Sequence, residues 1–302
     1  MTRDPIIAAR GLTRRYGRRI GVDDIDLDVS AGALFGFLGP NGAGKTTFIR
    51  LVLGFLRPSE GSVRVLGHDA WGGGARVKRD VGYLPGDLRL YPWMTAAGAL
   101  AIAGGVRGLD LREAGRELAE RFELETTVRV RAMSRGMRQK VGLILALAHR
   151  PRLLILDEPT SGLDPIMQDR LAQVLRERAA EGATVFFSSH TLSEVEQLCD
   201  SVAIVRRGRI VASESLRDLR RRARRSVTID FKDAATAAAA TPPAFLSVER
   251  RHAATWRASL IGETAQLVQW VATQPVVDLI LSPPDLESLF RAYYGSGEGV
   301  DA

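Results

Sequence analysis

Apolar residues along the chain form short runs that predict strands and longer periodic stretches that predict helices. Residues 6–10 and 22–29 alternate or are briefly apolar, which predicts an antiparallel sheet near the N-terminus. Continuous apolar runs, which are typical of strands buried in a parallel sheet, occur at 33–38, 153–156 and 183–187. The alternation of such strands with helical stretches predicts an α/β domain. The predicted helices cover residues 47–53, 95–105, 111–122, 139–149 and 165–180. Asp164 is expected to cap the last of these, and Thr191 to Glu194 should form a capping box for a further helix.

The pattern changes near residue 216. Residues 217–225 contain six arginines, and short strand-like and helical segments follow from Ser226 onward. Strands are predicted at 226–231, 246–251, 255–261 and 276–281, with helices at 263–273 and 284–294. We therefore expect three parts. They are an α/β domain over residues 1–215 with a helical subdomain at about 87–150, a basic linker over 216–225, and a small α+β domain over 226–302.

The composition of the chain indicates the cellular compartment in which we expect it. The single cysteine, Cys199, excludes an internal disulfide and fits a reducing compartment. No apolar run approaches the roughly 18 residues of a membrane span, and the charged residues Arg3 and Asp4 do not fit a signal peptide. We expect a cytoplasmic protein unless a partner holds it at a membrane.

The net charge of +7 owes much to the arginine run at 217–225. Such a run fits a solvated helix or linker, and it also fits attraction to anionic lipid on the cytoplasmic leaflet. Nucleic acid is the least supported partner, because no aromatic residues are interleaved for base stacking. We expect no nucleic-acid partner.

The clearest motif lies between a predicted strand and a predicted helix. It has the form G-x-x-x-x-G-K-[ST] of a phosphate-binding loop. Its glycines let backbone N–H groups face phosphate oxygens, and the following helix N-terminus adds partial positive charge. Lys45 would reach the β- and γ-phosphates of ATP, and the Thr46 hydroxyl would ligate Mg²⁺. The expected nucleotide-binding residues here are Gly39, Pro40, Asn41, Gly42, Ala43, Gly44, Lys45, Thr46 and Thr47.

Two carboxylates close the apolar run at 153–156. Asp157 and Glu158 would lie at the carboxyl edge of a parallel sheet, where such sheets place their ligands. Alone, such a pair could also be a surface turn. With a phosphate loop upstream, Asp157 is expected to hold Mg²⁺ through water, and Glu158 to polarise the attacking water.

Two further residues have both a structural and a functional interpretation. Tyr16 lies in a turn between the first two predicted strands, where its ring could stack on adenine or simply cap a sheet edge. His190 ends the strand at 183–190, and a histidine at a strand end is often structural. Its place at the same sheet edge as the acids is equally consistent with a role near the phosphates.

Taken in order, these motifs resemble the ATP-binding subunit of an ABC transporter, of the drug- or antibiotic-export type with a separate permease. The resemblance covers about residues 5–215 and implies an ABC-type P-loop fold with an antiparallel β subdomain. Residues 133–139 look like the family signature, and 161–164 match the loop that crosses the dimer interface. The resemblance makes His190 the switch histidine and places Tyr16 at the adenine. Residues 286–290 are similar to the last helix of such exporters.

The resemblance also implies a composite site. Lys45 of one chain and Ser134 with Gly136 of a second copy would contact the same ATP. The family usually has a glutamine where this chain has Gly86, so Asp87 or water would have to replace its contact with Mg²⁺. Met133 and Met137 also replace commoner residues of the signature, while Ser134 and Gly136 remain.

The implied function is ATP hydrolysis that powers efflux of a drug, antibiotic or lipid-like substrate through an integral membrane permease. Its cofactors would be ATP and Mg²⁺, and the chain would lie on the inner face of the cell membrane through the permease. A soluble ABC-type ATPase acting on ribosomes or DNA, or a regulatory nucleotide-binding subunit, is the alternative. The first usually has two cassettes or a long coiled coil, and this chain has one phosphate loop and no heptad insertion.

Overall fold

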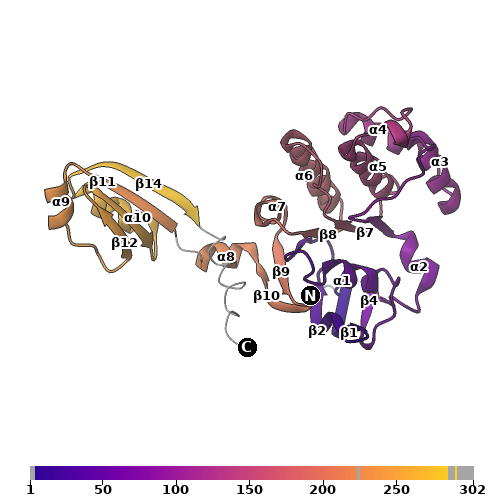
Figure 1. Cartoon of the computed structure of the whole chain (residues 1–302), viewed down its shortest axis with the longest axis horizontal. Helices are drawn as coiled ribbons and strands as arrows, with labels where there is room; N and C mark the ends of the chain where they lie inside the picture. The colour runs from indigo at the N-terminus through magenta and orange to yellow at the C-terminus, as the bar shows by residue number, and fades with distance from the viewer. Residues whose placement is uncertain (1–3, 223–224, 285–289, 291–302) are drawn as a thin grey trace. The chain divides into compact units, whose positions relative to one another are not determined.

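The computed structural model describes residues 4–222, 225–284 and 290, which divide into two compact units at Leu216 and Arg217. Unit 1 carries the phosphate loop, the acidic pair, the signature segment and His190, and unit 2 is a small α+β fold (Figure 1). The predicted helix at 284–294 and the motif at 286–290 lie, except for Phe290, outside the described residues.

An antiparallel sheet of strand order β2-β1-β4-β5 occupies one end of unit 1. Its first two strands are longer than predicted, because their antiparallel pairing continues as far as the Tyr16–Arg19 turn. The strands are β1 Ile7–Tyr16, β2 Arg19–Val29, β4 Glu60–Val65 and β5 His68–Asp69.

The second sheet of unit 1 has the strand order β10-β9-β3-β8-β7-β6, in which only the pair β9–β10 is antiparallel. The three continuous apolar runs became its buried strands β3, β7 and β8, as predicted. The strands are β3 Leu34–Leu38, β6 Val81–Leu84, β7 Leu153–Asp157, β8 Thr184–Ser189, β9 Ser201–Arg206 and β10 Arg209–Ser215.

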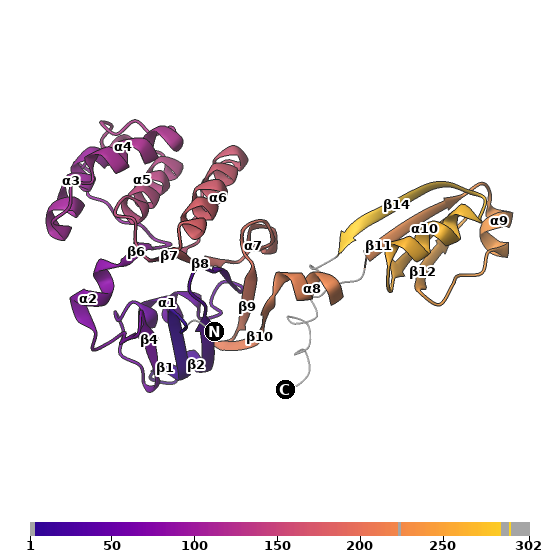
Figure 2. The ribbon, with the colours of Figure 1, turned by 180° about the vertical axis from the view of Figure 1, so that it is seen from behind.

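The helices of unit 1 lie in different places around the two sheets. Helix α1 packs between the two sheets, whereas α3, α4 and α5 gather at the far end from β1, β2 and β4 (Figures 1 and 2). The helices are α1 Lys45–Val52, α2 Gly74–Arg79, α3 Ala96–Arg107, α4 Arg112–Arg121, η1 Val130–Ala132, α5 Arg135–Leu147, α6 Pro165–Ala180 and α7 Leu192–Leu198.

Four phenylalanines form the centre of the core between α1 and the parallel sheet. Phe37 lies 4.7 Å from Phe48 and 5.2 Å from Phe186 between ring centroids, and Phe35 stacks on Phe186 at 5.9 Å. All four are at most 4% exposed. This cluster attaches the helix that follows the phosphate loop to the strands on which the loop depends.

Several helix ends follow from capping residues. Asp164 Oδ1 accepts from Met167 N at 2.9 Å at the start of α6, and Thr95 Oγ1 accepts from Gly98 N at 3.1 Å at the start of α3. The predicted end of α3 was wrong, because the helix continues beyond Gly104 to Arg107. Gly104 serves close packing instead, since a Cβ there would lie 2.5 Å from the Leu109 carbonyl oxygen.

A capping box predicted from Thr191 and Glu194 does not form. Thr191 makes no side-chain cap at the start of α7. Glu194 instead accepts hydrogen bonds from Thr160 Oγ1 at 2.8 Å and from Ser189 Oγ. The carboxylate is therefore used in tertiary contacts between β8 and the loop after β7, which local sequence could not indicate.

Unit 2 has the element order β-α-β-β-α-β and a four-stranded antiparallel sheet of order β12-β13-β11-β14. This order is that of a ferredoxin-like fold. Its core includes Trp256, which is fully buried and stacks on Trp270 of α10 at 6.3 Å. The elements are β11 Arg225–Phe231, α9 Ala234–Ala239, β12 Leu246–His252, β13 Thr255–Leu260, α10 Thr264–Ala272 and β14 Val276–Pro284.

The first part of the arginine run is helical. Residues Leu216–Arg222 form helix α8, and Arg225 already begins β11. Long, straight side chains such as Leu and Arg have good helix propensity, so the segment satisfies its own backbone groups.

Removing the central ring of the aromatic cluster tests this description of the core. Phe186→Ala is expected to lower the free energy of unfolding by about 3–5 kcal/mol, because it leaves a cavity between α1 and the sheet. Urea unfolding followed by circular dichroism measures the loss. Tyr91→Ala removes a ring that is 65% exposed and serves as the control, with an expected change within about 0.5 kcal/mol. Equal losses in the two variants would contradict the assignment.

Candidate functional site

The phosphate loop lies between the carboxyl end of β3 and the start of α1, as predicted. Two glycines are needed for its path. A Cβ at Gly39 would lie 2.5 Å from the Val205 carbonyl oxygen. Gly44 has φ 108°, and a Cβ there would lie 2.4 Å from the Gly21 carbonyl oxygen. The loop is therefore held between β9 and β2, with its backbone wrapped at the N-terminus of α1.

Lys45 is buried inside the loop, with 6% of its surface exposed. Its Nζ donates to the carbonyl oxygens of Gly39 at 2.6 Å and Pro40 at 3.4 Å. Glu158 Oε1 lies 3.3 Å from the same Nζ. A buried ammonium needs such partners, because burial without them carries a large desolvation cost. A phosphate placed at this loop would offer the ammonium an alternative set of oxygens.

Asp157 is the last residue of β7 and is 3% exposed. It accepts from Thr46 Oγ1 at 3.0 Å and from Ser188 Oγ at 2.9 Å. Burial raises the pKa of this carboxyl, while the bonds from Ser188 and Thr46 act in the opposite direction. The adjacent hydroxyl and carboxylate are hard oxygen donors of the kind that Mg²⁺ prefers.

Glu158 follows directly and turns the chain back. Its φ of 53° is in the left-handed region, and its N–H donates to the Ser188 carbonyl oxygen at 3.0 Å. His190 Nδ1 lies 2.5 Å from Glu158 Oε2. Gln139 Nε2 donates to the carbonyl oxygens of Glu158 and Pro159 at 3.2 and 3.0 Å. The carboxylate is thus fixed between Lys45 and His190 at the sheet edge.

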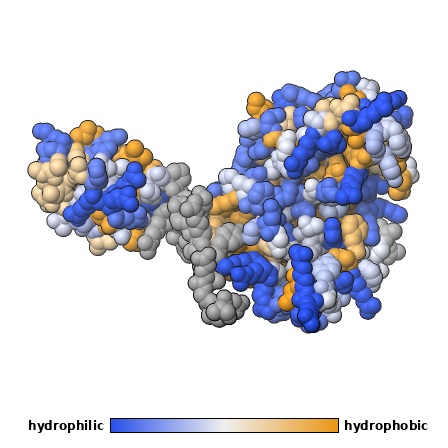
Figure 3. All heavy atoms as spheres, viewed as in Figure 1, coloured by the Kyte–Doolittle hydropathy of each residue, from blue (hydrophilic) through white to orange (hydrophobic). Residues whose placement is uncertain are grey.

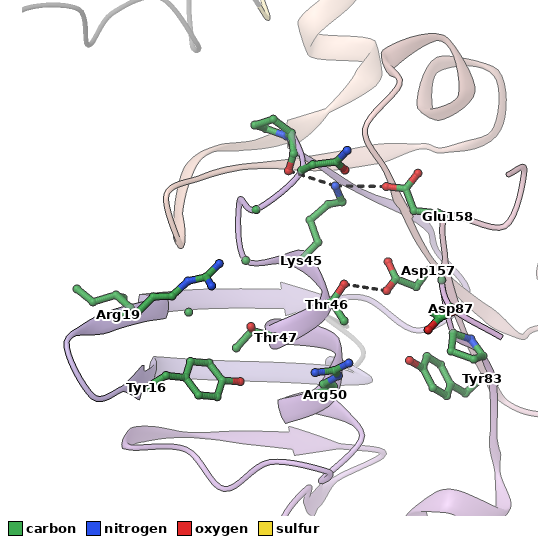
Figure 4. A pocket seen from close by; sticks show the side chains of 18 of the residues that line it. Tyr16, Arg19, Lys45, Thr46, Thr47, Arg50, Tyr83, Asp87, Asp157 and Glu158 are labelled. Atoms are coloured by element: carbon green, nitrogen blue, oxygen red, sulfur yellow. Dashed lines mark hydrogen bonds and ion pairs between the residues drawn. The ribbon is translucent and has the colours of Figure 1, made fainter. Parts of the chain in front are cut away.

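These groups surround a pocket of about 860 Å³ (Figure 4). Four cationic side chains from three segments face it together with three carboxylates. Its wall consists of Tyr16, Arg19, Ile20, Gly21, Pro40, Asn41, Gly42, Gly44, Lys45, Thr46, Thr47, Arg50, Tyr83, Pro85, Gly86, Asp87, Arg89, Asp157 and Glu158.

Most of the residues expected at the site line this pocket. Gly39 contributes through its bond with Lys45 and His190 through its bond with Glu158. Tyr16 is 40% exposed, and the Arg14 guanidinium carbon lies 5.0 Å from its ring centroid. Ala43 is buried behind the loop.

Ser134 and Gly136 do not line the pocket. Ser134 caps α5, where its Oγ accepts from Met137 N at 3.1 Å. Gly136 lies against the loop at 161–164, since a Cβ there would be 2.6 Å from the Gly162 carbonyl oxygen. Within this chain the signature segment is therefore built together with the 161–164 loop and not with the phosphate loop.

The segment after β6 departs from the family pattern at the pocket wall. Gly86 lies beside the acidic edge, where an added Cβ would be 3.4 Å from Asp157 Oδ2. Asp87 faces the pocket, but its side chain is 79% exposed and accepts from Arg89 Nε at 3.0 Å. Asp87 is thus near the site, with an arginine as its present partner.

Sequence reasoning missed several residues of the site. Ser188 binds Asp157, and Gln139, the last residue of the signature segment, holds the backbone of Glu158, yet neither was given a role of its own. Arg50 was detectable, because it lies four residues after Thr46 on the same helix face. Tyr83 and Arg19 reach the pocket from other strands, which only the tertiary fold reveals.

Comparison with known proteins identifies relatives of this chain. The family described as ABC transporter matches residues 22–161. An uncharacterized ABC transporter ATP-binding protein of Bacillus subtilis, YhaQ, is 37% identical over 228 residues, which cover 74% of this chain and 76% of that protein. The bacitracin transport ATP-binding protein BcrA of Bacillus licheniformis is 37% identical over 231 residues, covering 76% of each.

A solved structure described as an ATP-binding subunit of an ABC transporter has a TM-score of 0.67 and 32% sequence identity, over 72% of this chain and 92% of that one. The fold and site define a P-loop ATPase of the cassette type. The chain belongs to the ABC transporter family, as an ATP-binding subunit whose activity is ATP hydrolysis. Within the described ranges, no helix has the length and hydropathy to cross a membrane.

The burial of Asp157 makes a testable statement about stability. Because the folded state raises the pKa of this carboxyl, the charged form destabilises the nucleotide-free protein above that pKa. Asp157→Asn is therefore expected to raise the Tm at pH 7. The gain should shrink as the pH falls through the raised pKa of the folded carboxyl. It should vanish below the ordinary value of 3.8, where the carboxyl is protonated in both the folded and the unfolded state.

Thermal unfolding across this pH range provides the measurement. Asp28→Asn is the control, since that side chain is 51% exposed and lies at the surface; its Tm difference should be small. A lower Tm for Asp157→Asn at pH 7 would show that the carboxylate stabilises the empty site.

Proposed function

We propose that this chain is the ATPase subunit of an exporter and powers efflux of a drug, antibiotic or lipid-like compound through a separate permease. The observation that carries the proposal is the convergence of Lys45, Thr46, Asp157 and Glu158 on one pocket. The substrate class is supported by similarity to the bacitracin transport protein, which extends over 76% of both chains.

The phosphate chain of ATP would replace the present partners of Lys45. The ammonium would exchange its bonds with Gly39 and Glu158 for phosphate oxygens, while loop N–H groups and the α1 N-terminus bind the remaining charge. Tyr16 would then stack on adenine at the other end of the pocket. Its ring faces the pocket near Arg19 and Ile20 (Figure 4).

Mg²⁺ would be held by the Thr46 hydroxyl and, through water, by Asp157. Their oxygens lie 3.0 Å apart at the pocket wall. No cluster of three or more metal-binding side chains occurs in the described ranges. This donor set fits Mg²⁺, which usually takes one or two protein ligands together with substrate phosphates and water. When bound, the ion neutralises phosphate charge in the reaction.

Glu158 would polarise the attacking water once the γ-phosphate separates it from Lys45. Its carboxylate is already oriented by His190 at 2.5 Å and by the backbone bonds of the β7–α6 turn. His190 is 54% exposed in its side chain, so it can also reach a γ-phosphate in the pocket mouth. These two residues give the site a base and a group that senses the terminal phosphate.

A second copy of the chain would complete the site. Ser134 is exposed and Gly136 partly exposed, and they lie beside the 161–164 loop, away from the pocket of their own chain. A head-to-tail dimer would bring this segment to the γ-phosphate in the partner's pocket. ATP would then favour the closed dimer through contacts that hydrolysis removes.

An apolar groove of about 380 Å³ supports contact with a membrane permease. Phe55, Tyr83 and Ile102 line it, and Lys78 and Arg107 add positive charge. Helix α3 adds two exposed apolar side chains, Ile102 at 51% and Val106 at 85%. Figure 3 shows apolar and polar residues mixed on the face of unit 1 that it draws. The groove fits an apolar permease segment flanked by acidic residues, which would hold this chain at the inner face of the membrane.

Removal of the phosphate-loop ammonium tests the reaction. Lys45→Ala is expected to lower kcat for ATP hydrolysis by about 100-fold or more, because a charge-bearing donor to the transferred phosphate is lost. Lys232→Ala, in unit 2, is the matched control and should retain activity. Hydrolysis is measured as phosphate release by the purified full chain. Undiminished activity of Lys45→Ala would exclude the proposed site.

Loss of the base tests the dimer. Glu158→Gln should bind ATP without hydrolysing it, so the closed dimer accumulates. Size-exclusion chromatography with light scattering should report a dimer with Mg²⁺-ATP and a monomer without nucleotide. Glu177→Gln is the control, because that glutamate pairs with Arg121 at the surface. A Glu158→Gln chain that binds ATP yet stays monomeric would contradict the role given to Glu158.

A further inference from the structure

One residue lines both the nucleotide pocket and the apolar groove described above. Tyr83 of β6 lines the nucleotide pocket of about 860 Å³ and also the apolar groove of about 380 Å³. The remaining residues of the two walls differ. If the Tyr83 ring moves in response to a change in one cavity, the wall of the other cavity therefore changes as well.

On the pocket side, Tyr83 faces charged groups. Its ring lies near Asp87 and opposite Arg50, with Asp157 on the neighbouring strand (Figure 4). Burial raises the pKa of the Tyr83 hydroxyl to about 12, as does the charge of Asp157, and Arg50 opposes them. The hydroxyl is therefore neutral at physiological pH and can both donate and accept a hydrogen bond.

On the groove side, Tyr83 makes an apolar contact. The Phe55 ring meets it edge to face, with centroids 6.0 Å apart and planes at 67°. Lys78 Nζ lies 5.1 Å from the Phe55 ring centroid. Phe55 itself is 51% exposed and lines the groove. The shape of this end of the groove thus depends on where the Tyr83 ring lies.

The position after β6 where the family usually has a glutamine carries no side chain in this chain, because it is Gly86. Gly86 approaches Asp157 from the segment after β6 and carries no donor or acceptor beyond its backbone. Asp87 beside it is exposed and paired with Arg89. We propose that Tyr83 is the positioning residue that couples the nucleotide pocket to the apolar groove in this chain.

The coupling would arise from a change of charge around the hydroxyl. Phosphates and Mg²⁺ held at Thr46 and Asp157 would change the charge that the Tyr83 hydroxyl faces, and so shift the position of its ring. The ring transmits the shift to Phe55, because packed side chains change between discrete arrangements. By linkage, an occupant of the groove alters nucleotide affinity by the same factor. This inference rests on the proposed nucleotide site.

A cysteine placed in the groove tests the coupling in the full chain. Ala103→Cys in a Cys199→Ala background adds one thiol to the groove wall, and its rate of reaction with a maleimide reports the local shape. Saturating Mg²⁺ and a non-hydrolysable ATP analogue should change this rate by at least about fivefold. Val106→Cys, on the same helix but outside the groove lining, should show no such change.

The decisive variant removes only the hydroxyl. Tyr83→Phe should reduce the nucleotide effect at position 103 to less than about twofold, at analogue concentrations that calorimetry shows to saturate this variant. Tyr91→Phe is the matched control, since Tyr91 lines neither cavity, and it should keep the full effect.

Two results would overturn the inference while leaving the nucleotide site intact. One is an unchanged nucleotide effect in Tyr83→Phe. The other is no effect in the parent chain although calorimetry shows the analogue bound. Absence of analogue binding in the parent chain would instead contradict the proposed nucleotide site, and the coupling with it.

Discussion

The site depends on the parallel pairing of β3 with β8 and of β8 with β7. Parallel strands end at the same edge of a sheet, so three segments that are far apart in the chain deliver their next residues to one place. The phosphate loop follows β3, Asp157 and Glu158 close β7, and His190 follows β8. The phenylalanine cluster packs α1 against the sheet, so the geometry of the site depends on the packing of this core.

The charged groups of the site are arranged to bind phosphate. Lys45 is buried and neutralised by loop carbonyls and Glu158, while Asp157 is buried with a raised pKa. Glu158 also adopts a left-handed backbone conformation, which is unfavourable for a residue with a Cβ. These costs are typical of functional sites. Binding of an anion with its metal ion would offset the buried charges of Lys45 and Asp157. Nucleotide binding is therefore expected to stabilise the folded protein.

Local sequence was sufficient where a motif determines its own backbone. The phosphate loop, the buried strands and the Asp164 cap of α6 could all be predicted, because glycines, apolar runs and capping side chains act within a few residues. Local sequence was insufficient where tertiary contacts competed. Glu194 bonds to Thr160 and Ser189 instead of capping α7, and Gly104 packs inside α3 instead of ending it. Tyr83 enters the pocket only because β6 lies beside β7.

The central claim is that each ATP is bound by two chains, with Lys45 from one and Ser134 with Gly136 from the other. Mixing two inactive chains tests it directly. Lys45→Ala alone and Ser134→Arg alone should not hydrolyse ATP. In their mixed dimer one of the two sites keeps both intact halves, so the mixture should recover up to about a quarter of wild-type hydrolysis. No recovery, with mixed dimers demonstrated by light scattering of size-tagged chains, would contradict the shared site.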